Sequence, residues 1–126
     1  MATGIERGSP FAFLASAART ADVTSQQFHV GQARGLIVII DVTAIAATPS
    51  VVFNVRGFDP ISGKSYLLLA SAAIVAVSTV VLRIHPELTA AANLIAKDLC
   101  PNIVEVFADH IDADSITYSV TGMTTL

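Results

Sequence analysis

Apolar and polar residues alternate along most of this chain, with the period of two that is typical of β-strands. The most regular example is GLIVIIDVTA. One set of its side chains would face a core: Leu36, Val38, Ile40 and Val42. The other set begins with Ile37 and Ile39 and is also largely apolar. We expect a central strand, or one that a neighbouring subunit covers.

The same pattern predicts further strands. They are separated by Pro, Gly and Asp turns, and are expected around residues 18–24, 51–56, 66–70, 78–85, 102–110 and 114–122. DPISGK supplies the reversal of a hairpin. In the returning strand of that hairpin, Tyr66, Leu68 and Ala70 are expected to face inward. Residues 86–101 are rich in Ala and predict either a short helix or an irregular loop.

About seven to eight short strands with at most one short helix favour an all-β fold, an antiparallel β-sandwich. The 126 residues are enough for one domain with a buried core. We expect residues 19–126 to form the sandwich and residues 1–18 to form an N-terminal arm.

Composition adds a constraint on the surface. Hydrophobic residues make up 53% of the chain and charged residues only 13%, with a mean hydropathy of +0.67. So apolar a chain either buries much of its surface against partners or enters a membrane. The run at residues 65–82 is uncharged, but its hydroxyl and β-branched residues favour strands. We therefore expect burial against partners and no membrane span.

The net charge of −3 and the absence of a Lys/Arg cluster argue against nucleic-acid binding. No catalytic or phosphate-binding motif is present, so we expect neither an enzyme nor a cofactor. His29, His85 and His110 lie on separate segments without zinc-ligand spacing. The single Cys100 is expected to be an inert, apolar residue.

FADHIDADSITYSV concentrates acidic residues between two predicted strands. Asp109, Asp112 and Asp114 could supply oxygen ligands to a calcium ion, but the segment lacks the Gly and Glu of an EF-hand loop. The alternative is a polar reversal at residues 110–114, in which Asp112 or Asp114 caps the turn through its side chain. We favour the turn and expect no metal.

Several stretches together resemble a family of small head proteins of tailed bacteriophages. They are GLIVIIDVTA, DPISGKSY, HPELTAAAN and DADSITYSV, and the similarity runs from about Arg19 to Val120. The resemblance implies a virion structural protein of the decoration, or cement, type, which stabilises the head by binding major capsid subunits. No residue-level function is carried over, because no catalytic motif anchors the similarity.

This resemblance implies a location on the outer capsid surface, with the host cytoplasm as the place of assembly. The implied partners are the major capsid protein and copies of the chain itself in a homo-oligomer. The expected interface residues are the apolar side chains of the arm and of the central strand: Phe11, Phe13, Leu14, Ile37 and Ile39. The alternative function is a tail- or fibre-associated module that binds a host receptor or glycan, in one version with calcium bound at Asp109, Asp112 and Asp114.

Overall fold

A computed structural model describes residues 3–4 and 8–125, and these residues form a β-sandwich without a helix. Seven strands have seven or more residues: β2 (Phe11–Arg19), β5 (Gly35–Ile45), β6 (Val51–Asp59), β7 (Lys64–Ala70), β8 (Ser78–Ile84), β10 (Ile103–His110) and β11 (Ile116–Thr125). Four more have two residues each: β1 (Thr3–Gly4), β3 (Val23–Thr24), β4 (Phe28–His29) and β9 (Ile95–Ala96). The predicted fold class is confirmed.

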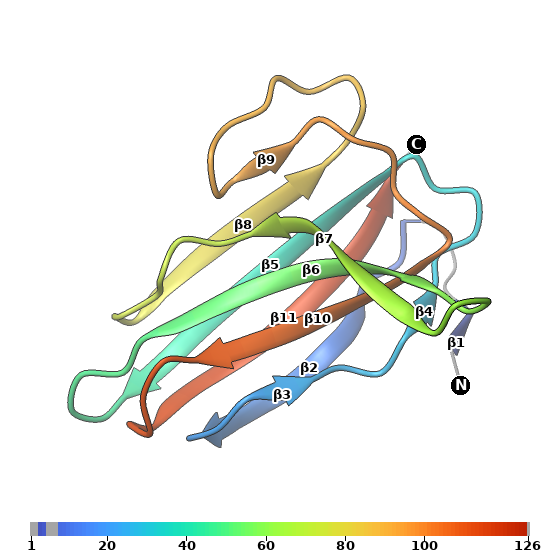
Figure 1. Cartoon of the computed structure of the whole chain (residues 1–126). Helices are drawn as coiled ribbons and strands as arrows, with labels where there is room; N and C mark the ends of the chain where they lie inside the picture. The colour runs from blue at the N-terminus through green and yellow to red at the C-terminus, as the bar shows by residue number, and fades with distance from the viewer. Residues whose placement is uncertain (1–2, 5–7, 126) are drawn as a thin grey trace.

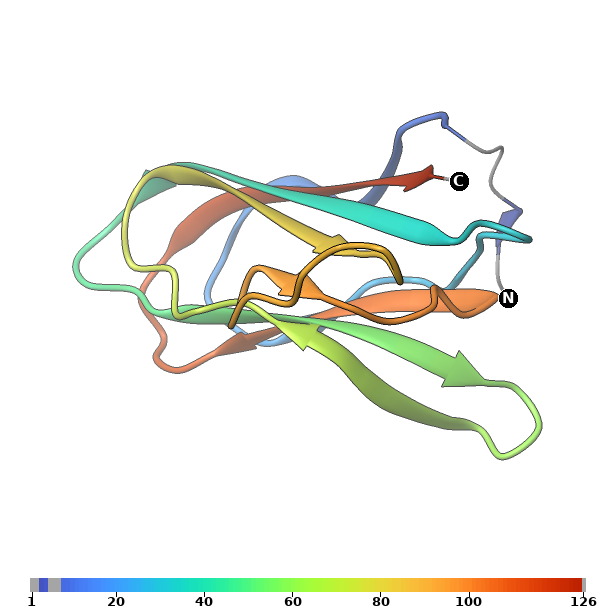
Figure 2. The ribbon, with the colours of Figure 1, turned by 90° about the horizontal axis from the view of Figure 1, so that it is seen from above.

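The strands form two sheets that pack face to face, as Figure 1 and Figure 2 show. We call them sheet A, with the order β1-β4-β10-β6-β7, and sheet B, with the order β2-β11-β5-β8-β9. The short β3 also pairs with β10, in sheet A. Pairing is antiparallel except for the short pairs β1–β4 and β8–β9, which are parallel and were not predicted.

The core lies between the sheets and follows the predicted alternation. In sheet B the inward side chains of β5 and β11 are fully buried, among them Val38, Ile40 and Tyr118. In sheet A the same is true of Phe53 and Val106. Burial of this continuous apolar layer is the main stabilising contribution to the fold.

The predicted boundary at residue 18 falls inside a strand. β2 pairs antiparallel with β11 as an edge strand of sheet B, so residues 11–18 belong to the sandwich of this chain. Residues 1–2 and 5–7 of the predicted arm lie outside the described residues. The single strand expected over residues 18–24 is also wrong, because β2 ends at Arg19 and β3 begins at Val23.

In β7, the returning strand of the hairpin, the residues that face the core differ from those predicted. A bulge between Val55 and Arg56 inserts Leu68 into β7, and Leu69 instead faces the core. Tyr66 lies against Gly57 but remains 47% exposed. A bulge adds one residue to one strand and so reverses the faces beyond it, which simple alternation cannot anticipate.

The segment expected to be a short helix or a loop is a loop. Residues 85–102 contain turns and the two-residue β9, which pairs with the end of β8. The helix alternative is therefore excluded for these residues.

Candidate interaction surfaces

The outer face of sheet B carries an apolar stripe. Ile37 and Ile39 of β5 point away from the core, as the alternation predicted, because their neighbours Val38 and Ile40 point inward. Ile37 is paired with Met123 of β11, and Ile39 with Val81 of β8. All four of these outward side chains are half-buried. We call Ile37, Ile39, Val81 and Met123 the sheet B stripe.

Polar side chains border the sheet B stripe. Arg83 lies opposite Ile37 on β8 and is exposed. At the other end of the stripe, the Thr79 hydroxyl donates a hydrogen bond of 3.1 Å to the carboxylate of Asp41. Thr121 lies beside Ile39 on β11. An apolar centre with a polar border is the usual arrangement of a protein–protein interface.

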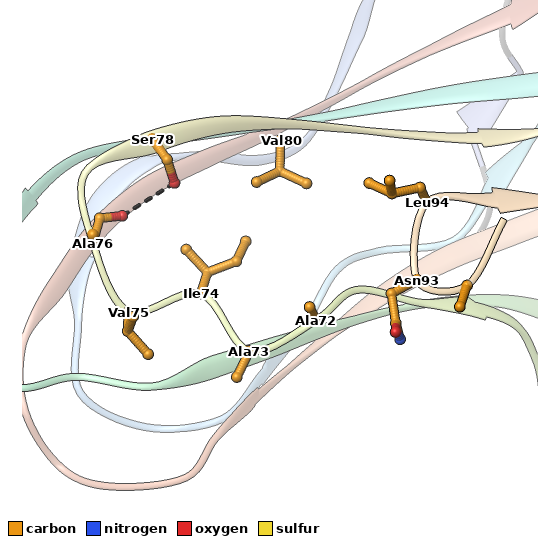
Figure 3. A pocket seen from close by; sticks show the side chains of 10 residues that line it. Ala72, Ala73, Ile74, Val75, Ala76, Ser78, Val80, Asn93 and Leu94 are labelled. Carbon is orange, nitrogen blue, oxygen red and sulfur yellow. Dashed lines mark hydrogen bonds between the residues drawn. The ribbon is translucent and has the colours of Figure 1, made fainter.

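A second apolar surface lies at the open side of the sandwich, between β7 and β8. It is a hollow of about 430 Å³, lined mainly by the β7–β8 connection, by Val80 and by residues 92–94. Figure 3 shows Ile74, Val80 and Leu94 pointing toward one another across this hollow. No charged side chain lines it. The hollow therefore suits apolar contacts rather than the binding of an ion.

The edge of β8 beside this hollow is only partly covered. β9 pairs with Arg83 and Ile84 alone, and the strand from Ser78 to Leu82 has β5 on one side only. Sheet edges with unpaired backbone groups are sites where another strand can add. The opposite edge of sheet B differs, because β2 is bulged and the Arg19 guanidinium binds two of its carbonyl oxygens.

Two of the predicted interface residues lie in the core, and a third, Phe11, is half-buried. Phe13 and Leu14 of β2 are only 4% and 8% exposed and belong to the core. Phe11 and Phe13 pack against Phe28 of sheet A, with ring centroids 4.8 Å and 5.3 Å from that ring. The register of β2 shifts along β11, so that Phe13 and Leu14 are both buried although adjacent in sequence. The Phe13 ring is thus covered by this chain, whereas the Phe11 ring remains half-buried.

The acidic segment is a turn between β10 and β11, as favoured from the sequence. The Asp112 carboxylate accepts the backbone N–H of Asp114 at 3.0 Å. The Asp114 carboxylate in turn accepts the backbone N–H and the hydroxyl of Thr48. Asp109 remains in β10, paired with Val52 of β6. Two of the three candidate calcium ligands therefore have protein partners, and they stabilise two adjacent turns.

Within residues 3–4 and 8–125, no three His, Cys, Asp or Glu side chains are grouped in a way that could hold a metal ion. His29 lies at the end of β4 and is exposed, whereas His85 follows β8 and His110 ends β10. The histidines are thus on separate elements. Burial raises the pKa of the Cys100 thiol to about 12, so it stays protonated at neutral pH and is a poor nucleophile.

The uncharged run at residues 65–82 forms most of β7, the connection that lines the hollow, and the start of β8. In the part of the chain that the structure describes, no helix has the length and apolar character needed to cross a membrane.

Two parts of these surfaces were missed in the sequence. Met123 lies beyond the predicted end of the last strand at residue 122, although the alternation continues to Thr125 in the sequence. The hollow could not be predicted from the sequence, because its shape depends on how the loop at residues 91–94 folds back toward β7. There the Asn93 amide donates to the carbonyl of Ala70, and Asn93 has a positive φ of 62°.

No family model matches the chain, and no curated protein matches it. Among solved structures, the chain is similar to the SPBc2 prophage-derived protein YomS, with a TM-score of 0.51 and 15% sequence identity. The similarity covers 90% of this chain and 91% of that protein. At this identity the comparison shows a shared fold over nearly the whole length of both chains. The chain therefore has the fold of a prophage-derived protein, which agrees with the phage resemblance at the level of the fold.

Proposed function

We propose that this chain is a structural protein of a phage virion, of the decoration type, and that it binds major capsid subunits through the sheet B stripe. The fold that it shares with a prophage-derived protein supports a phage origin. The stripe itself is the observation that carries the proposal, because it places Ile37, Ile39, Val81 and Met123 together on an open sheet face.

Leaving the apolar side chains of this face in contact with water costs free energy. Removing apolar area from water contributes roughly 25 cal/mol per Å², so a partner that covers the stripe gains free energy from contact with all four side chains. A flat sheet face suits a large, relatively flat partner such as a capsid surface. The polar border at Asp41 and Arg83 would set the orientation of binding more than its strength.

The side chains of the outer face of sheet A offer less to a partner. Arg56 and Glu105 form an ion pair at 2.7 Å, and the guanidinium of Arg56 lies over the ring of Phe107. The ion pair is already largely removed from water, because the Glu105 side chain is only 4% exposed and that of Arg56 25%. A partner that covered it would have to bury the remaining exposed part of the Arg56 side chain, which costs free energy.

Replacement of Ile39 with lysine tests the proposal. A partner that covers the stripe would have to bury the new ammonium group, so we expect Ile39→Lys to bind capsid shells at least about tenfold more weakly than the wild type. Binding is measured by co-sedimentation of the purified chain with capsid shells that lack it. The fold should survive, because Ile39 is already half-exposed on the outer face.

The matched control is Ile61→Lys. Ile61 is 96% exposed in the turn between β6 and β7, so the same chemical change is made far from the stripe. This variant should bind as the wild type does. If a folded Ile39→Lys variant binds shells as tightly as Ile61→Lys, the stripe is not the contact surface.

A further inference from the structure

A hydrogen bond joins the two sheets at the end of the sandwich where β10 turns into β11. His110 is the last residue of β10 in sheet A, and Tyr118 lies in β11 of sheet B. The His110 Nε2 atom is 3.0 Å from the Tyr118 hydroxyl oxygen. Figure 1 shows the turn that connects β10 of sheet A with β11 of sheet B at this end of the molecule.

Tyr118 is the enclosed member of this pair, whereas His110 is half-buried. Tyr118 is fully buried, and its ring packs edge-on against Phe53 with a centroid distance of 4.8 Å. Burial raises the pKa of Tyr118 to about 12, so its hydroxyl stays protonated at ordinary pH. His110 is therefore the partner whose charge can change.

The second ring nitrogen of His110 has no partner. Its Nδ1 atom is buried and makes no hydrogen bond to any atom of the described residues. A neutral imidazole carries one N–H, whereas the protonated ring has two and needs an acceptor for each. Protonation would therefore leave a buried, charged N–H group without an acceptor, which is costly.

Charged groups from three neighbouring segments face this ring. The Arg19 guanidinium, from β2, lies 4.6 Å from the centre of the Tyr118 ring and donates to the Tyr118 carbonyl. Asp22, from the turn before β3, accepts the backbone N–H of His110 at 2.7 Å. Asp109 precedes the ring in β10, and Asp112 follows it in the turn.

These influences on the ring oppose one another. Burial is the largest and lowers the pKa of His110 below its ordinary value of 6.5. The positive charge of Arg19 lowers this pKa as well, whereas the carboxylates of Asp22, Asp112 and Asp109 raise it. The net effect is that the folded protein favours the neutral ring.

We propose that His110 and Tyr118 form an acid-sensitive latch between the two sheets, which holds this end of the sandwich closed at neutral pH and loosens it when the ring is protonated. The segments freed would be the β10–β11 turn and the turn between β2 and β3, which Asp22 ties to His110. The latch is independent of the proposed capsid role, because it concerns the stability of the chain itself.

The direction of the pH effect follows from the shift. A histidine whose pKa is lower in the folded state than in the unfolded chain adds its full stabilisation above pH 6.5. That stabilisation is lost as the pH falls below the unfolded value toward the folded one. The loss therefore occurs in mildly acidic solution, at higher pH than that at which most carboxylates titrate.

The test on the unmodified protein is an NMR titration of the histidine rings. We expect the pKa of His110 to lie below the ordinary histidine value of 6.5, and its Nε2 signal to report the hydrogen bond to Tyr118 in the neutral form. The hydrogen-exchange protection factors, which correct for the intrinsic pH dependence of exchange, should fall in residues 108–118 and 20–24 from pH 7.5 to pH 5.5 more than in β5. A His110 pKa at or above 6.5 would overturn the proposal.

A variant gives the second measurement. His110→Gln keeps an N–H donor toward Tyr118 but has no group that titrates in this range. We expect its melting temperature to fall less than that of the wild type between pH 7.5 and pH 5.5, by a few degrees. His29→Gln is the matched control and should show the full wild-type fall. An equal fall in all three proteins would contradict the latch.

Discussion

Replacing Phe53 with alanine should lower the free energy of unfolding by about 4 kcal/mol. The Phe53 side chain is completely buried in β6 and meets the Tyr118 ring across the core, so the substitution leaves a cavity between the two sheets. The backbone of Phe53 is bonded to Ser71 on both its N–H and its carbonyl, which limits the collapse of the cavity. Chemical denaturation followed by circular dichroism measures the loss.

Phe58→Ala is the matched control for this substitution. Phe58 belongs to the same strand but points to the outer face of sheet A and is only half-buried. Losing this ring should cost about 1 kcal/mol, because less apolar area returns to water and no cavity forms. Equal losses for the two variants would contradict the assignment of the core to the space between the sheets.

Replacing Arg56 with methionine should destabilise the fold by about 3 kcal/mol. The Glu105 side chain is 4% exposed, and its carboxylate is held by the Arg56 guanidinium at 2.7 Å and by the Ser65 hydroxyl at 2.9 Å. Methionine keeps the apolar part of the side chain but removes the charge. Glu105 would then be a buried carboxylate with one neutral partner, which is the costly state.

One comparison separates this explanation from a loss of packing. The double variant Arg56→Met/Glu105→Leu removes both charges and should regain most of the stability, to within about 1 kcal/mol of the wild type. A double variant as unstable as the single one would show that the ion pair is not the cause.

The alternation of apolar residues was sufficient to predict the fold class and the faces of the long central strands. In β5, β6, β10 and β11 the residues that face the core are those that the alternation predicts. In a regular antiparallel pair, residues opposite each other point to the same side of the sheet, so the alternation is not interrupted. The turn at residues 110–114 was predictable as well, since Asp side chains commonly bond to the backbone two residues ahead.

The errors occur where pairing is irregular. The bulges in β2 and β7 change which residues face the core, and nothing in FAFLASAAR or KSYLLLA marks the inserted residue. For the same reason Phe13 and Leu14 were expected at an interface with a neighbour, although they complete the core of their own chain. An apolar strand at the edge of a sheet has the same composition as an apolar arm, and only the register distinguishes the two.

The candidate surfaces were predictable to different degrees. Ile37 and Ile39 were predicted as surface candidates because β5 is apolar on both faces, whereas only one face of a sheet in a sandwich lines the core. Val81 and Met123 lie beside them only because of the register in which β8 and β11 pair with β5, and this register could not be read from the sequence. The ion pair of Arg56 with Glu105 and the bond of His110 to Tyr118 join residues 49 and 8 positions apart, and their burial follows from the packing of the sheets.

The most direct test of the proposed role is the number of copies of this chain in virions purified from the strain that carries its gene. Quantitative mass spectrometry with labelled standards gives the ratio of this chain to the major capsid protein. A decoration protein that binds each capsid subunit or each symmetric group of subunits predicts a ratio of one or a simple fraction of it. A count of only a few copies per particle, or none, would contradict the account.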